Sequence, residues 1–96
     1  MANSENVKVS LHTRRKRLRY RAWHRGTQEM DMVLGHFVDA KVGEMKEGKM
    51  DRLEKLMDEQ DTDLLKWVMG QEPMPDDVDA ELIQQLIEFQ MNRTKL

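Results

Sequence analysis

Residues 25–29 read Arg-Gly-Thr-Gln-Glu and place a cation, a bare backbone position and a carboxylate within one short stretch. This combination suits recognition of another molecule, because opposite charges fix an orientation and a glycine lets a second backbone approach closely. A purely local interpretation is also open. Gly26 would then end one helix in a left-handed conformation, and Glu29 would complement the dipole of the next helix. Both interpretations place a corner between two helices.

The other residues capable of chemistry do not form a recognisable site. The histidines lie on three separate predicted elements, and none has the spacing or the carboxylate partner of a zinc site; they are His12, His24 and His36. The acidic pairs within residues 58–63 are typical of helix caps and solvated faces. The two serines lie near the N-terminus without a predicted base, and no glycine-rich phosphate loop is present. We therefore predict neither catalytic residues nor a metal site, and no enzymatic activity.

The composition is typical of one small, highly charged helical domain. The 96 residues are 39% hydrophobic and 35% charged, with five glycines and two prolines, which disfavours a β-sandwich or a disordered chain. Cysteine is absent, which excludes disulfides and thiolate chemistry. No apolar run approaches the roughly 20 residues that cross a membrane, and no secretory signal is recognisable. We expect a soluble, cytoplasmic protein without membrane insertion.

The net charge of −2 is unevenly distributed along the chain. Residues 1–27 contain eight Lys or Arg and one Glu, whereas the remainder contains eight basic and 17 acidic residues. The basic segment either closes the fold against the acidic body or presents a positive surface to an acidic partner. Nucleic-acid binding is disfavoured, because the pI is about 5.9 and the arginines circle their helix instead of lining one face.

The spacing of apolar residues predicts an all-α chain, a small five-helix bundle with a flexible N-terminal tail over residues 1–10 and one domain over residues 11–96. The predicted helices cover residues 13–23, 27–47, 50–59 and 62–69, and a last stretch that begins at 77 or 79. Thr13 and Asp61 are predicted N-caps, and Gly26, Gly48 and Gly70 are predicted helix ends.

The helical spacing also predicts the core. The inward positions are Leu18, Ala22, Met30, Val33, Leu34, Phe37, Val38, Val42, Met45, Met50, Leu53, Leu56, Met57, Leu64, Leu65, Val68, Leu82, Ile83, Leu86, Ile87 and Met91. Packing therefore explains most of the nine methionines better than a hydrophobic groove does. Trp67 lies beside this stripe and is either a core residue or an interface anchor. Gly35 and Gly43 each weaken their helix by roughly 1 kcal/mol, which predicts close approach of another helix there.

A resemblance to a known family rests on two ordered motifs. Residues 17–37 read RLRYRAWHRGTQEMDMVLGHF, and residues 56–67 read LMDEQDTDLLKW. The first resembles the RGxxE motif and acidic-apolar helix of the succinate dehydrogenase flavinylation factors, the group of bacterial SdhE and mitochondrial succinate dehydrogenase assembly factor 2. The second is similar to the family's leucine-acid stretch that leads to Asp-x-Asp-Leu and a tryptophan. The likeness spans about residues 13–90, and His24 departs from it where many members carry a second arginine.

The resemblance implies an assembly factor that binds the flavoprotein subunit of succinate dehydrogenase or fumarate reductase and promotes covalent attachment of FAD to a histidine there. The partner-binding residues that it implies are Arg25, Gly26 and Glu29, with Asp31, Asp61, Asp63 and Trp67 adjacent. No dinucleotide fingerprint is present, so we do not expect tight binding of free FAD. We expect a monomer when free, located in the bacterial cytoplasm, with the mitochondrial matrix as the alternative. The rival functions are an arginine-rich nucleic-acid-binding module and an antitoxin-like regulator.

Overall fold

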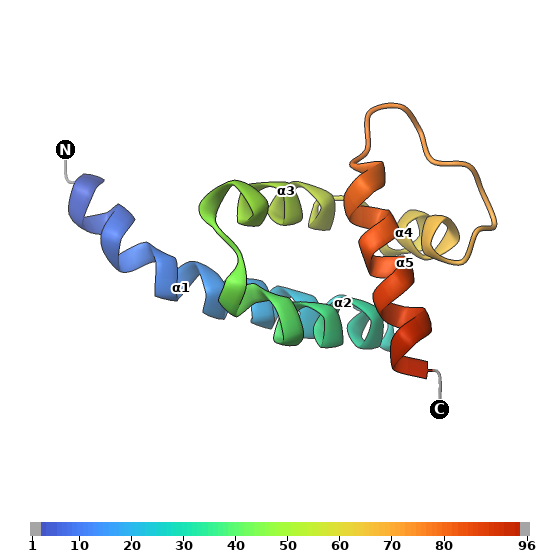
Figure 1. The fold of residues 1–96 in the computed structure, drawn as a ribbon, viewed down its shortest axis with the longest axis horizontal. Coiled ribbons are helices and arrows are strands. Elements are labelled where there is room, and N and C mark those ends of the chain that lie inside the picture. Colours follow the sequence, from blue (N-terminus) through green and yellow to red (C-terminus); the bar gives the residue numbers. More distant parts are fainter. Residues whose placement is uncertain (1–2, 95–96) are drawn as a thin grey trace.

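The computed structural model describes the backbone of residues 3–94 and the side chains of residues 11–93. Its elements are α1 (Asn3–Trp23), α2 (Gln28–Lys41), the 3-10 helix η1 (Val42–Glu44), α3 (Glu47–Met57), α4 (Asp61–Val68) and α5 (Ala80–Thr94). Within residues 3–94 there is no strand, so the predicted five-helix, all-α architecture is confirmed. α1 packs against α2 and α3, while α5 packs against α2 and α4 (Figure 1).

The inward stripes of the five helices form one continuous hydrophobic core. The core positions predicted in α2 and α3 are all buried, whereas Leu65 and Ile87 are only partly buried. The prediction for Met91 was wrong, because its side chain is 64% exposed. α5 instead faces α2 through Phe89, whose ring meets Phe37 edge-on with centroids 5.6 Å apart. Met91 follows two residues later, about 200° further round the helix, and so faces outward.

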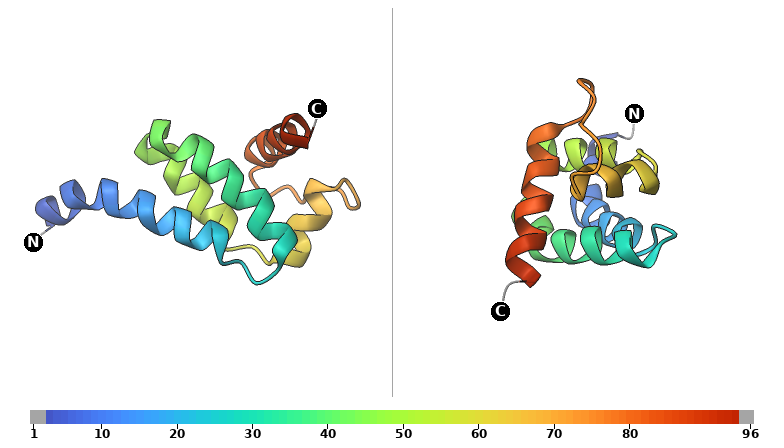
Figure 2. Two further views of the ribbon diagram at one scale, coloured as in Figure 1. Left: turned by 90° about the horizontal axis from the view of Figure 1, so that it is seen from below. Right: turned by 90° about the vertical axis from the view of Figure 1, so that its right-hand side faces the viewer.

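The first helix begins well before its predicted start. α1 runs from Asn3, so Thr13 lies inside the helix and is not its N-cap. No glycine or proline interrupts residues 3–23, and the local propensity therefore continues the helix towards the N-terminus. The first turns of α1 project beyond the other helices (Figures 1 and 2), in agreement with a segment that stands apart from the packed domain. Residues 1–2 of the predicted tail lie outside the described residues.

The predicted second helix is interrupted after α2. Arg15 of α1 donates from Nε to the carbonyl of Val42 at 3.1 Å and from Nη2 to the carbonyl of Met45 at 3.0 Å. The Val42 carbonyl also accepts the Met45 N–H at 3.1 Å, so Arg15 is a second donor to it. Gly43 lies in η1, where a Cβ atom would have no neighbour within 4 Å, so the close approach predicted there was wrong. Gly48 lies inside α3 and does not end α2.

The close approach predicted at Gly35 is confirmed. A Cβ atom at this position would lie 2.4 Å from two ring carbons of Trp23, the last residue of α1. The Trp23 indole donates from Nε1 to Oδ2 of Asp39 at 3.1 Å and meets the ring of His36 edge-on, with centroids 5.1 Å apart. The missing side chain of Gly35 therefore lets the end of α1 pack tightly on α2.

Replacing Gly35 with alanine should lower the free energy of unfolding by about 1–3 kcal/mol, because the added methyl group forces the Trp23 ring to move. Gly48→Ala is the matched control, since nothing lies within 4 Å of that position. It should leave stability unchanged or slightly higher. Urea unfolding of both variants measures the difference, and equal stabilities would contradict the tight contact with Trp23.

The start of α5 is fixed by a carboxylate and an arginine. Asp79 Oδ1 accepts the Leu82 N–H at 3.1 Å, so an aspartate caps the helix as predicted. Arg52 of α3 donates to Asp79 Oδ2 at 2.7 Å and to Oδ1 at 2.9 Å, and also to Glu81 at 2.9 Å. The hydrogen bonds from Arg52 are the main reason that the pKa of Asp79 lies below its ordinary value.

Because the pKa of Asp79 is lowered in the folded state, the free energy of unfolding should decrease as the pH falls. Asp79 stabilises the fold fully above its unfolded pKa, about 4, and the contribution is lost as the pH falls from there through the folded pKa. Asp79→Asn keeps a capping oxygen but cannot titrate. Its free energy of unfolding should therefore fall less steeply than that of the wild type below about pH 4. Urea unfolding at several pH values tests this, with Asp58→Asn, whose carboxylate is 75% exposed, as the control. Parallel profiles for Asp79→Asn and the wild type would refute it.

Two features are absent from the described part of the chain. None of its helices combines the length and the apolar character that a bilayer-spanning segment requires. No three His, Asp or Glu side chains among those residues converge closely enough to hold a metal ion.

Candidate functional site

The corner between α1 and α2 has a tightly defined backbone. Gly26 adopts φ of +113°, a conformation that residues with a Cβ rarely reach. Thr27 is the N-cap of α2, and its Oγ1 accepts the Met30 N–H at 3.3 Å. The Arg25 N–H donates to Oδ1 of Asp31 at 2.6 Å, which holds the corner against the first turn of α2. The corner is therefore fixed by hydrogen bonds on both sides of its glycine.

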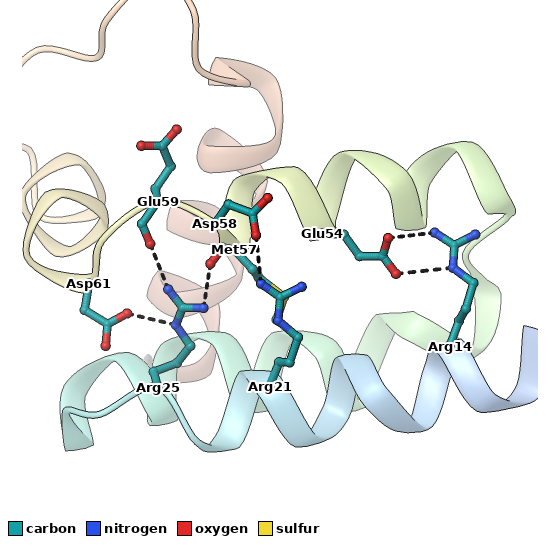
Figure 3. Close-up of polar contacts among 8 residues, drawn as sticks. All are labelled: Arg14, Arg21, Arg25, Glu54, Met57, Asp58, Glu59 and Asp61. Carbon is teal, nitrogen blue, oxygen red and sulfur yellow. Dashed lines mark hydrogen bonds and ion pairs between the residues drawn. The ribbon is translucent and has the colours of Figure 1, made fainter. Parts of the chain in front are cut away.

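The Arg25 side chain turns into the bundle (Figure 3). Its Nε donates to Oδ1 of Asp61 at 2.8 Å, Nη1 to the carbonyl of Met57 at 2.7 Å and Nη2 to the carbonyl of Glu59 at 2.9 Å. The side chains of Arg25 and Asp61 are only 10% and 13% exposed. Because Met57 is the last residue of α3, the guanidinium meets the negative end of that helix dipole. One side chain thus joins the α1–α2 corner to the α3–α4 turn.

In the free protein, Arg25 therefore directs its charge into the bundle and not towards the solvent. All three guanidinium nitrogens already donate to groups of the bundle. Asp61 is not the predicted N-cap of α4 either: the cap residue is Gln60, which makes no side-chain capping bond. Asp61 is instead the ion-pair partner of Arg25. Both residues shape the corner and have little side-chain surface left for contact with another molecule.

Two other predicted contact residues are also committed to the fold. Trp67 is only 6% exposed and belongs to the hydrophobic core, which decides between its two open interpretations. Asp31 is half-buried and accepts the hydrogen bond from the Arg25 backbone. Asp63, in the first turn of α4, is half-buried. Of these three residues, only Asp63 keeps side-chain surface without a hydrogen-bond partner among the described residues.

The surface that remains open is the corner itself. We call it the corner patch, and its exposed residues are Gly26, Thr27, Gln28 and Glu29. Among the described side chains, Glu29 has no hydrogen-bond or ion-pair partner. It does not close a capping box. A capping box needs a glutamate three residues after the N-cap, and Glu29 lies only two residues after the N-cap Thr27. The corner patch therefore presents one unpaired carboxylate next to a glycine on a fixed backbone.

Most of the described arginines of α1 form hydrogen bonds or ion pairs within the molecule. Arg14 donates to Glu54 at 3.2 and 3.0 Å and to Asp51 at 2.6 Å, and these bonds, first those to Glu54, raise the pKa of Arg14. Arg21 donates to Asp58 at 3.1 Å. Figure 3 shows these arginines side by side along α1, reaching towards α3. Of the two interpretations left open, the structure supports the one in which the basic helix closes the fold against the acidic body.

Sequence reasoning missed the acceptors that fix the corner. The carbonyls of Met57 and Glu59 are backbone groups 32 and 34 residues away from Arg25, so no residue type or spacing marks them. The cap at Thr27 did carry a signal. A threonine that directly follows a glycine and precedes an acidic first turn is typical of a helix start.

Comparison with known proteins gives four informative matches, one to a family profile and three to individual relatives. The profile of a family described as "Flavinator of succinate dehydrogenase" matches residues 16–90. The FAD assembly factor SdhE of Acetobacter pasteurianus is 33% identical over 79 residues, which cover 82% of this chain and 72% of that protein. SdhE of Colwellia psychrerythraea is 33% identical over 87 residues, covering 91% and 93%. The mitochondrial succinate dehydrogenase assembly factor 2 of Arabidopsis thaliana is 34% identical over 80 residues, which cover 83% of this chain but 40% of that protein.

Proposed function

Because this chain belongs to the family of succinate dehydrogenase flavinators, we propose that it is an assembly factor for a flavoprotein. It binds the flavoprotein subunit of succinate dehydrogenase, or of the related fumarate reductase, and promotes covalent attachment of FAD to that subunit. The names of the relatives, FAD assembly factor and succinate dehydrogenase assembly factor, support this function. The two proposed partners share the covalent flavin, so the bound flavin is the product to be measured.

The observation that carries the proposal is the corner patch. Its backbone is held from beneath by the hydrogen bonds of Arg25, while Gly26 and Glu29 stay exposed. A surface that is already ordered loses little conformational entropy when a partner binds. The RGxxE residues thus have two separate roles in this proposal: Arg25 positions the corner, and Gly26 and Glu29 make the contact.

The chemistry of the corner patch defines what it would recognise. The Glu29 carboxylate accepts hydrogen bonds, so it suits an arginine, a lysine or free backbone N–H groups of the flavoprotein. Gly26 has no side chain, and the partner's backbone can therefore lie directly against it. Of the predicted acidic neighbours, only Asp63 is still proposed to contact the flavoprotein. Arg25, Asp61 and Trp67 act through the shape of the corner.

We infer that the factor supplies binding and no reacting group. Its affinity would be higher for the conformation of the flavoprotein in which the flavin and the acceptor histidine are aligned. Binding then raises the population of that conformation and brings the two reacting groups together. The covalent bond forms within the flavoprotein, between its own histidine and its own FAD.

The direct test is to mix the purified flavoprotein subunit and FAD with and without this chain. Covalently bound flavin is then followed by its fluorescence in a denaturing gel. The proposal predicts a faster rise with the chain present, and capture of the flavoprotein by the immobilised chain at moderate salt. Capture of nucleic acid, with affinity falling steeply as salt rises, would favour the rival module instead. Equal rates of flavin attachment with and without the chain would refute the proposed function.

A further inference from the structure

A hollow of about 570 Å³ lies at the opposite end of α2 from the corner patch. It is formed where α5 crosses α2 (Figure 2), together with η1 and the start of α3, and we call it the α2–α5 hollow. Its apolar lining comes from Phe37, Met45 and Phe89. The two aromatic rings meet edge-on with centroids 5.6 Å apart. This volume lies within the range of sites that bind small molecules, and exceeds what one aromatic side chain would fill.

Three lysines line the same hollow: Lys41, Lys46 and Lys49. None of them has an ion-pair partner among the described side chains, in contrast to the arginines that join α1 to α3. Lys49 donates from Nζ to Oε1 of the neutral amide of Gln85 at 2.6 Å, and the Lys41 ammonium lies 6.0 Å from the centroid of the Phe89 ring. The hollow therefore combines an apolar wall with cations that no carboxylate pairs directly.

Two carboxylates also line the hollow, those of Glu44 and Glu88. The lining is therefore one charge more positive than negative. The Gln84 side chain donates to Oε2 of Glu88 at 3.5 Å, and neither carboxylate lies within ion-pair distance of the three lysines. An incoming anion would meet ammonium groups that keep their hydrogen-bonding capacity, next to aromatic carbon.

We propose that the α2–α5 hollow binds a small aromatic anion, a planar ring system that carries a sulfonate, phosphate or carboxylate. The rings lie against Phe89, above the buried Phe37, and the anionic group accepts hydrogen bonds from Lys41 and Lys49. Lys46 adds a third positive charge at the rim. The ligand is a free small molecule, since the hollow has room for two or three fused rings. This site is independent of the proposed flavoprotein docking, because it shares no residue with the corner patch.

The test uses anilinonaphthalene sulfonate as the anionic probe and phenylnaphthylamine as its neutral counterpart. Amide NMR of the full chain should show saturable binding of the sulfonate, with shifts concentrated around Phe37, Met45 and Phe89. Lys41→Gln and Lys49→Gln should each weaken binding by about two- to fivefold, the effect of losing one exposed charge pair. The neutral probe should bind more weakly than the sulfonate by a similar or larger factor.

Lys16→Gln and Lys55→Gln are the matched controls, because both lysines lie outside the hollow. They should leave the affinity for the sulfonate unchanged. Circular dichroism of every variant checks that the helices are retained. Shifts centred elsewhere, equal affinity for the neutral probe, or no binding at millimolar concentration would each overturn the proposal. The experiment needs no flavoprotein, so its outcome is separate from that of the proposed function.

Discussion

Arg25→Met should lower the free energy of unfolding by about 3–5 kcal/mol, the range for breaking a buried ion pair from one side. The substitution removes three hydrogen bonds and leaves the Asp61 carboxylate, only 13% exposed, without its cation. It also leaves the carbonyl of Met57, the last residue of α3, and that of Glu59 in the following turn without their donor. Urea unfolding followed by circular dichroism measures the loss as a lower midpoint.

Arg21→Met is the matched control for this prediction. Arg21 lies one helical turn earlier on α1 and pairs with Asp58, whose carboxylate is 75% exposed. Its loss should cost no more than about 1 kcal/mol. If Arg25→Met proves too unstable to study, Arg25→Met with Asp61→Leu should recover part of the stability, because the buried charge is then gone. Equal losses for the two single arginine variants would contradict the structural role of Arg25.

Glu29→Gln should reduce the rate of covalent flavin attachment to the partner by about tenfold or more at limiting concentration of the factor. Losing one charged partner in an interface typically costs about 2–5 kcal/mol, and about 1.4 kcal/mol already corresponds to tenfold in affinity. Stability should change by no more than about 0.5 kcal/mol, because Glu29 is exposed and unpaired among the described side chains. The flavin fluorescence assay and urea unfolding provide the two measurements.

Glu47→Gln is the control, since this exposed glutamate begins α3 outside the corner patch. It should support flavin attachment at the wild-type rate. An unchanged rate for Glu29→Gln would show that Glu29 does not make the proposed contact. The proposed function itself is tested separately, by comparing flavin attachment with and without the wild-type chain.

The glycine of the corner patch allows the same separation of function from stability. Gly26→Ala and Gly70→Ala both place a Cβ on a residue with positive φ, at +113° and +72°. Each should lose about 1–2 kcal/mol of stability through backbone strain. Only Gly26→Ala should also reduce flavin attachment, because Gly70 lies beyond α4, away from the corner. Parallel effects of both variants on flavin attachment would mean that lost stability alone explains them.

The helices were predictable because their apolar residues repeat with the period of a helix. Their ends were less so, for reasons that particular residues show. The start of α1 depended on the absence of a breaker, and Thr13 resembled a cap although the helix continues through it. Beyond the end of α2, Arg15 of another helix donates to the carbonyls of Val42 and Met45. Contacts of this kind join distant parts of the chain and leave no local pattern.

The sequence predicted the position of the corner between α1 and α2, but not the direction of its side chains. The motif at residues 25–29 located the corner, and Gly26 was correctly expected to adopt a special backbone conformation. The inward turn of Arg25 depends on Asp61, 36 residues away, and could not be read from the motif. Trp67 posed the same problem. Whether an aromatic residue beside a core stripe is buried depends on how far the neighbouring helices cover it, and the local sequence does not show this.

The position of the Arg25 guanidinium has a consequence for when the protein becomes competent. Its three acceptors come together only after α3 has ended and α4 has begun, so an incompletely folded chain lacks the support beneath Gly26 and Glu29. Under the proposed function, the chain would then bind the flavoprotein only after it had folded completely. The order of the corner would thus depend on the completed fold of α3 and α4, through a single arginine.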